Sequence, residues 1–247
     1  MIDINGKTAI LTGASAGIGL GILRALAAEG VNLAITARRP GPLEAAAAAA
    51  REQGVRVLAV PGDVADLDHV RAFVAAAIAE FGAIDYLVNN AGINTDLRNL
   101  HDIPLETWQE VVEINLNSVY YVIRELLPHL RSNQQGHIIN IISGAGYSLR
   151  PNATSGVAYI ASKHGVTGLS HAINSEEWEN GIRCSAVYPG EVDTAMLDTD
   201  HQRLQPGEAE MVMQPEDIAA AVVFAARTHP RALVADVYMQ PSRHRNR

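Results

Sequence analysis

The sequence contains very little cysteine: Cys184 is the only one in 247 residues. One cysteine cannot form a disulfide within the chain, which excludes a disulfide-stabilised scaffold and fits a reducing compartment. Its apolar neighbours predict a small buried strand residue. The first residues lack the basic and apolar segments of a signal peptide, and no apolar run is long enough to span a bilayer. We therefore expect a cytoplasmic protein that has no membrane partner.

Basic residues are also fewer than acidic ones. The chain has 19 Lys and Arg against 27 Asp and Glu, a net charge of −8, which argues against nucleic acid as a partner. No linker or internal repeat divides the chain, and its length suits one α/β domain. We expect one domain over residues 1–240, with a substrate loop or lid near 191–213, and a polar, basic tail over 241–247. No metal site is predicted.

Apolar runs alternate with helical patterns along the chain. The apolar runs are rich in Val, Ile, Leu and Ala, which is typical of a parallel sheet covered on both faces. This alternation predicts an α/β, single-domain Rossmann fold, a doubly wound parallel sheet of seven strands with helices on both faces. The expected strands are Thr8–Thr12, Asn32–Thr36, Arg56–Val60, Tyr86–Asn89, His137–Ile142, Arg183–Tyr188 and Leu233–Tyr238. The expected helices are Ile18–Glu29, Leu43–Gln53, Leu67–Phe81, Leu105–Leu130, Val157–Asn180 and Pro215–Thr228.

A glycine-rich turn follows the first expected strand and opens the first helix, over Thr12–Gly19. Glycine lets the backbone approach a pyrophosphate, and a helix N-terminus supplies free N–H groups and a positive dipole end. Such turns also serve only to pack a helix against a strand, but the position of this one favours a dinucleotide site. The expected cofactor contacts are Gly13, Ser15, Ala16, Gly17, Ile18 and Gly19.

Two further clusters bear on which dinucleotide binds. After the second strand, an acid would accept bonds from a ribose 2′-hydroxyl, whereas an arginine would pair with a 2′-phosphate. Ala37 stands where the acid is expected and is followed by Arg38 and Arg39, which favours NADP(H); the alternative is a solvated pair of surface arginines. Asp63 and Val64 follow the third strand as further cofactor contacts, and Asp63 is expected to bond the adenine amino group, with an early helix cap as the alternative.

Amide and small residues follow the fourth strand, over Asn89–Gly92. They permit close approach to a cofactor and can tie neighbouring loops together through side-chain hydrogen bonds. A second amide, Asn115, lies inside the expected helix Leu105–Leu130. Because Asn is a mediocre residue inside a helix, we expect it to have a polar role, although Asn117 is a competing choice. The expected cofactor contacts of the first group are Asn90, Ala91 and Gly92.

Tyr159 and Lys163 stand four positions apart in an expected helix, so they lie on the same face. A nearby positive charge favours the phenolate and lowers the pKa of the phenol. A tyrosine adjusted in this way can donate or accept a proton at a carbonyl or alcohol oxygen. The alternative for Tyr159 is an aromatic ring that packs against a neighbouring helix. The spacing alone is weak evidence and gains weight from the motifs that precede it.

These motifs together resemble the short-chain dehydrogenase/reductase family. They occur in the family's order and separation over most of the chain, which argues against a chance match. The matching pieces are Thr12–Gly19, Asp63, Asn89–Gly92, Asn115, Ser143, Tyr159–Lys163 and Pro189–Thr194.

The resemblance implies a mechanism and further site residues. Tyr159 would be the general acid in carbonyl reduction and the base in alcohol oxidation. Lys163 would lower its pKa and bond the nicotinamide ribose, Ser143 would polarise the substrate oxygen, and Asn115 would hold a water that links Lys163 to solvent. The family also implies a homodimer or homotetramer. The remaining expected cofactor contacts are Pro189, Gly190, Val192 and Thr194.

The chain departs from the family's pattern in two places. Sixteen positions separate Ser143 from Tyr159, more than is usual, so the longer segment 144–156 is expected to border the substrate pocket and influence specificity. Ala16 stands where many NADP(H)-preferring relatives carry a basic residue, which leaves the two arginines after the second strand to hold the phosphate and keeps NAD(H) possible. The expected substrate pocket consists of Asn94, Gly144, Ala145, Tyr147, Arg150 and Met196.

The sequence therefore favours an oxidoreductase that transfers a hydride between NADP(H) and a small ketone or secondary alcohol. One alternative is an NAD(H)-dependent alcohol dehydrogenase of the same family. Another is a dinucleotide-binding regulatory protein without turnover, against which the complete set of Asn115, Ser143, Tyr159 and Lys163 argues.

Overall fold

A parallel sheet of seven strands forms the centre of the protein, as predicted. The computed structural model describes residues 1–147, 155–197, 204 and 207–243. Within them the strand order is β3-β2-β1-β4-β5-β6-β7, and every neighbouring pair is parallel. The strands are β1 (Thr8–Thr12), β2 (Asn32–Ala37), β3 (Val57–Pro61), β4 (Tyr86–Asn89), β5 (Gly136–Ile141), β6 (Ile182–Pro189) and β7 (Asp236–Met239).

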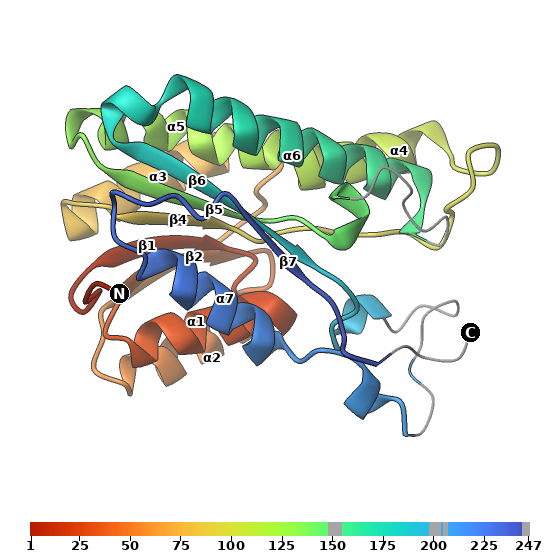
Figure 1. Cartoon of the computed structure of the whole chain (residues 1–247), viewed down its shortest axis with the longest axis horizontal. Coiled ribbons are helices and arrows are strands. Elements are labelled where there is room, and N and C mark those ends of the chain that lie inside the picture. Colours follow the sequence, from red (N-terminus) through yellow and green to blue (C-terminus); the bar gives the residue numbers. More distant parts are fainter. Residues whose placement is uncertain (148–154, 198–203, 205–206, 244–247) are drawn as a thin grey trace.

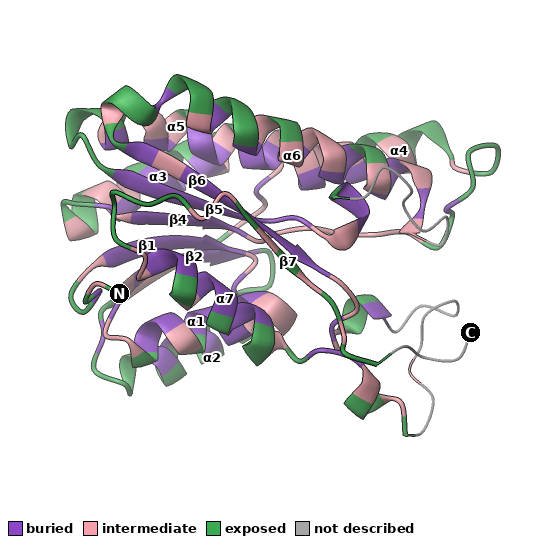
Figure 2. Ribbon diagram, viewed as in Figure 1, coloured by how far each residue is buried: buried purple, intermediate pink, exposed green. Residues whose placement is uncertain are grey.

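Helices cover both faces of this sheet, and Figure 1 shows α1, α2 and α7 on one face and α3 to α6 on the other. Each face has its own layer of buried apolar side chains, and the central strands between the two layers are buried (Figure 2). The helices are α1 (Gly17–Ala28), α2 (Pro40–Arg51), α3 (Leu67–Phe81), α4 (Leu105–Val112), α5 (Ser118–Ser132), α6 (Val157–Glu176) and α7 (Pro215–Ala226).

The winding of the sheet reverses at β1, which pairs with β2 on one side and β4 on the other. At such a reversal, the helices on either side leave the sheet on opposite faces and a crevice opens at the carboxyl ends of the strands. The turns that follow β1 to β6 all start at this edge, because the strands are parallel. The sequence motifs of these turns therefore converge there.

The helix expected over Leu105–Leu130 is interrupted. A π-helical turn at Glu113–Asn117 separates α4 from α5. Such turns insert a residue into the helix and often occur at functional sites. Here the turn contains the fully buried Asn115, whose side-chain amide hydrogen-bonds the backbone of Ile93.

The remaining differences between the expected and the observed fold lie at the ends of helices and strands. The last strand begins at Asp236 rather than Leu233, because the carbonyl of Ala235 accepts the first bond, from the N–H of Ala186. Helix α2 begins earlier than expected, at Pro40, whose fixed φ suits a first helical position. Cys184 is fully buried, as predicted. None of the described helices has the length and apolar content needed to cross a membrane.

Candidate active site

The turns at the carboxyl edge of the sheet enclose one cleft of about 680 Å³. Its walls come from the turns after β1, β2, β3 and β4, from the end of β5, and from α6. Most of the expected cofactor contacts line it, namely Gly13, Ser15, Ala16, Gly17, Ile18, Gly19, Arg38, Arg39, Asp63, Val64, Asn90, Ala91, Gly92, Tyr159, Lys163 and Thr194.

The glycine-rich turn leaves no space for side chains. Gly13 has a φ of +67°, and a Cβ added there would lie 2.9 Å from the Cα of Ala91. A Cβ on Gly19 would lie 2.1 Å from the carbonyl oxygen of Gly13. Helix α1 starts at Gly17, and Ala16 offers no side-chain cap, so the first N–H groups have no side-chain acceptor at this cap. A bare turn with uncapped N–H groups fits a pyrophosphate.

Side-chain hydrogen bonds tie the turn after β1 to the turn after β4. The hydroxyl of Thr12 accepts bonds from the N–H groups of Asn90 and Ala91, over 3.0 and 3.1 Å. The Asn90 amide donates in return to the carbonyl oxygens of Thr12 and Gly13, each over 3.1 Å. The two turns that border the cleft on either side of the winding reversal are thereby fixed relative to each other.

Two exposed arginines stand at the end of the cleft beyond β2. Arg38 and Arg39 line it next to the buried Ala37, and within the described residues neither forms an ion pair. Asp63 lines the same end, and its carboxylate accepts a bond from the N–H of Ala65 over 3.0 Å. Two cationic side chains are therefore available to bind an anion at this end of the cleft.

Tyr159 and Lys163 line the other end of the cleft, and Ser143 lies next to Tyr159 without lining the cleft itself. Tyr159 is the third residue of α6, and its side chain is hydrogen-bonded with the hydroxyl of Ser143, just beyond β5. The Lys163 ammonium lies 5.6 Å from the centre of the Tyr159 ring and donates to the carbonyl of Ile141 over 3.2 Å. Both ionisable residues are buried, so their charges act in a medium that screens them weakly.

Burial sets the direction of both pKa shifts. It raises the pKa of Tyr159, and the hydrogen bond from Ser143 and the positive charge of Arg98 oppose this rise with smaller effects. Burial also lowers the pKa of Lys163 to about 8. The sequence predicts a lowered pKa for Tyr159, but the net shift is upward because the loss of water around the phenol outweighs its charged neighbours.

The side chain of Asn115 holds the loop after β4 next to Lys163. Its side chain accepts a bond from the N–H of Ile93 over 2.8 Å and donates to the carbonyl of the same residue over 2.9 Å. A Cβ added to Gly92 would lie 3.3 Å from the Asn115 amide oxygen and 3.4 Å from the Lys163 ammonium. The competing candidate, Asn117, points its amide at Glu113 instead.

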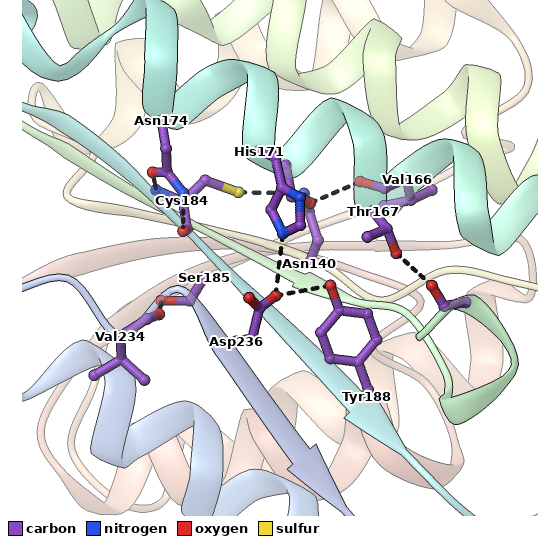
Figure 3. A network of polar contacts seen from close by, with 12 residues as sticks. Asn140, Val166, Thr167, His171, Asn174, Cys184, Ser185, Tyr188, Val234 and Asp236 are labelled. Carbon is purple, nitrogen blue, oxygen red and sulfur yellow. Dashed lines mark hydrogen bonds and ion pairs between the residues drawn. The ribbon is translucent and has the colours of Figure 1, made fainter. Parts of the chain in front are cut away.

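Polar contacts along α6 hold the helix in place behind these residues (Figure 3). The hydroxyl of Thr167 donates to the carbonyl of Gly146, in the turn that begins at Ser143, over 2.9 Å. Farther along, His171 and the hydroxyl of Tyr188 meet at the carboxylate of Asp236. Helix α6 is thus attached both to the Ser143 turn and to β7.

The comparison with known families agrees with this geometry. The model of short chain dehydrogenases matches residues 7–205. The chain belongs to the short-chain dehydrogenase family. It is an NAD(P)-dependent oxidoreductase that acts on CH–OH groups or the corresponding ketones.

Relatives match this short-chain dehydrogenase over nearly the whole chain. The D-beta-hydroxybutyrate dehydrogenase of Cupriavidus necator is 31% identical over 238 residues, which cover 90% of this chain and 91% of the relative. A metagenomic short-chain oxidoreductase in complex with NADP is 30% identical, with a TM-score of 0.82 and coverage of 97% and 99%. Carveol dehydrogenase from Mycobacterium avium in complex with NAD is 27% identical, with a TM-score of 0.88 and coverage of 97% and 98%.

The residues expected to form the substrate pocket of this dehydrogenase do not all line the cleft. Asn94 and Met196 line the cleft. Gly144 and Ala145 form the turn beside Ser143. Tyr147 is half-exposed and does not line the cleft; its ring lies 4.7 Å from that of Tyr238 and 4.9 Å from that of Tyr188. Arg150 lies outside the described residues.

The segment from Pro189, the last residue of β6, to Thr194 approaches the glycine-rich turn only at Thr194. Pro189 ends the strand, and a Cβ added to Gly190 would lie 2.7 Å from the side chain of Gln240. Val192 pairs with Met213 in an isolated bridge. A Cβ on Gly17 would lie 3.1 Å from the methyl group of Thr194, so Thr194 lies directly over the start of α1. Pro189, Gly190 and Val192 do not line the cleft.

Sequence reasoning misses several apolar residues of the cleft. They carry no chemical motif, but each stands at or just beyond the carboxyl end of a predicted strand or beside a predicted polar residue, and this position could have identified them. They are Ile93, Ile114, Ile141 and Ile142. Within the described residues, no group of three or more His, Cys, Asp and Glu side chains is placed to hold a metal ion.

Proposed function

We propose that the protein transfers a hydride between NADP(H) and a small ketone or secondary alcohol, with Tyr159 as the general acid and base. The observation that carries this proposal is that Tyr159, which interacts with Ser143, and Lys163 line one end of a cleft whose other end has a side-chain-free glycine turn and two arginines. A dinucleotide that spans the cleft would place its nicotinamide near the tyrosine.

The protonation state of Tyr159 supports the reduction step at neutral pH. In reduction, the Tyr159 hydroxyl donates its proton to the carbonyl oxygen while the carbonyl carbon accepts a hydride, which the nicotinamide supplies when bound. The raised pKa keeps the phenol protonated at neutral pH, as a general acid requires. In oxidation the reverse transfer occurs, and the phenolate accepts the alcohol's proton; because the pKa of Tyr159 is raised, this direction is favoured in alkaline solution.

Ser143, Lys163 and Asn115 support this step in different ways. The Ser143 hydroxyl, which hydrogen-bonds Tyr159, is proposed to donate to the same substrate oxygen. Lys163 supplies positive charge below its pKa of about 8 and is proposed to bond the nicotinamide ribose. Asn115 fixes the backbone at Ile93 and is proposed to hold the water that links Lys163 to solvent.

Preference for NADP(H) rests on the two arginines after β2. Arg38 and Arg39 are exposed at the cleft, and Ala37 offers no carboxylate to a ribose 2′-hydroxyl. A guanidinium pairs well with a 2′-phosphate. NAD(H) is the second candidate, because Ala16 adds no cation at the glycine turn and the carveol dehydrogenase neighbour was crystallised with NAD. A homodimer or homotetramer in the cytoplasm stays a prediction.

A steady-state assay tests the proposal directly. Purified protein is assayed with NADPH and with NADH against a panel of ketones, and with the oxidised cofactors against the matching alcohols. Tyr159→Phe should reduce kcat by about 10²- to 10⁴-fold, the usual contribution of a general acid, with unchanged cofactor affinity. The exposed Tyr120→Phe is the matched control. Full turnover in Tyr159→Phe would exclude the acid–base role, and cofactor binding without any turnover would favour a regulatory protein.

A further inference from the structure

Arg98 is buried beside the candidate active site and belongs to none of the sequence motifs. It lies in the loop after β4 and is 7% exposed. Among the described residues, Arg98 and Lys163 are the two buried cations. Removing a guanidinium from water costs several kcal/mol unless its surroundings compensate it. A guanidinium buried at this position therefore needs contacts that compensate for its lost hydration.

Arg98 joins the loop after β4 to the start of α6. Its carbonyl accepts a bond from the N–H of Val157 over 3.1 Å, and its Nε donates to the carbonyl of Thr95 over 2.8 Å. Gly156, at a φ of +88°, lies against the arginine stem, since a Cβ there would be 3.1 Å from the Arg98 Cγ. The stem thus packs three residues before Tyr159, against the residue that precedes α6.

The charge of Arg98 differs from that of Lys163 in its pH range. The Lys163 ammonium, with a pKa of about 8, loses its charge in mildly alkaline solution, whereas a guanidinium stays protonated throughout. The positive charge of Arg98 opposes the rise that burial causes in the pKa of Tyr159. The first N–H groups of α6 present a positive dipole end in the same region.

We propose that Arg98 is a positioning residue for proton transfer, which acts on the Tyr159 hydroxyl through its permanent charge and through its packing at the start of α6. This inference rests on the proposed role of Tyr159 as acid and base. It assigns the two cations different tasks: Lys163 supplies a charge that depends on pH, and Arg98 supplies one that does not. Alcohol oxidation, which needs the phenolate, depends most on Arg98 above the pKa of Lys163.

Three substitutions of Arg98 separate charge from packing. Arg98→Gln removes the charge, Arg98→Met removes it but keeps an aliphatic stem against Gly156, and Arg98→Lys replaces the permanent charge with one that burial makes dependent on pH, as in Lys163. The measurement is the pH profile of kcat for alcohol oxidation with the best substrate of the panel, together with the Kd for NADPH and the Tm. Arg71→Gln, which replaces a half-exposed arginine on α3, is the matched control.

The rising limb of the profile, where activity increases as Tyr159 loses its proton, should move up by about one pH unit in Arg98→Gln and Arg98→Met. It should also move up in Arg98→Lys, because a buried amine is neutral at the pH where Tyr159 loses its proton, and it should stay in place in the control. The Met variant provides the test if the Gln variant does not fold. If neither folds, the position of the limb in Arg98→Lys decides.

A limb that stays in place in the Gln and Met variants, even with reduced kcat, would overturn the proposal and leave Arg98 as a structural anchor. A Lys variant whose limb stays in place would overturn it as well, because its buried amine is neutral where the limb is measured. Tyr159→Phe distinguishes this failure from that of the proposed function. If Tyr159→Phe is inactive while the limb is unmoved, only the inference about Arg98 fails; if Tyr159→Phe is active, the proposed function itself fails.

Discussion

The side-chain amide of Asn115 donates a hydrogen bond to the hydroxyl of Ser162 over 3.2 Å. Ser162 precedes Lys163 in the chain, and its own hydroxyl donates to the carbonyl of Tyr159 over 2.8 Å. This contact connects the π-helical turn between α4 and α5 to the segment of α6 that carries both ionisable residues. The same amide also bonds the backbone of Ile93, so one side chain fixes two walls of the cleft.

Asn115→Ala should therefore reduce both stability and activity. It removes three hydrogen bonds and leaves the N–H and carbonyl of Ile93 without this partner, which costs about 1–3 kcal/mol for each buried group left unsatisfied. Urea unfolding and kcat measure the two effects. The matched control is Asn117→Ala, which changes an amide of the same π turn that bonds Glu113 and is only half-buried. Equal losses in the two variants would contradict the role given to Asn115.

The parts of this site that are local in sequence could be predicted from it. The glycine turn and the Tyr159–Lys163 spacing depend on one turn or one helix, and the structure places them in one cleft. The π turn at Asn115 could not be predicted, because it depends on bonds to a loop 22 residues away. The direction of the Tyr159 pKa shift and the burial of Arg98 depend on how α6 packs against that loop, which the residue pattern does not contain.

The boundaries of β7 show the same limit in the fold. The apolar run from Leu233 predicts a strand three residues longer at its start. In the sheet, β7 is an edge strand that pairs only with β6, and the pairing begins at Asp236 opposite Ala186. An edge strand has one partner, so the register of that partner, and not the apolar run itself, determines where it starts.

Gly19→Ala should destroy cofactor binding. The new methyl group would lie 2.1 Å from the carbonyl oxygen of Gly13 and 2.5 Å from the Asn90 amide, so the turn must move to accept it. Gly168→Ala is the matched control, because a Cβ there has no atom within 4 Å, and it should stabilise α6 by about 0.5–1 kcal/mol through helix propensity. NADPH fluorescence titration and thermal unfolding test both. Normal NADPH affinity in Gly19→Ala would refute the proposed pyrophosphate site.

Arg38→Ala should weaken NADPH much more than NADH. Loss of a charge-assisted hydrogen bond to the 2′-phosphate costs about 1.5–3 kcal/mol, which corresponds to about a 10- to 100-fold increase in the Kd for NADPH. NADH, which lacks that phosphate, should be affected little. Arg24→Ala, an exposed position on α1, is the control for a general change in surface charge. A loss of the same size for both cofactors would count against the phosphate assignment to Arg38.

The rate of carbonyl reduction should fall as the pH rises through about 8, the pKa of Lys163. A lysine with a lowered pKa is charged below that value and neutral above it, so its support for Tyr159 and for the nicotinamide ribose is complete at pH 7 and lost by pH 9.5. Once Lys163 is mostly neutral, its charged fraction decreases about tenfold for each further pH unit. Measurements of kcat/KM for reduction from pH 6 to 10 give the midpoint, and unfolding curves at the same pH values control for loss of the fold. A flat profile over this range, in protein that remains folded, would show that the ammonium charge of Lys163 contributes nothing to the reaction.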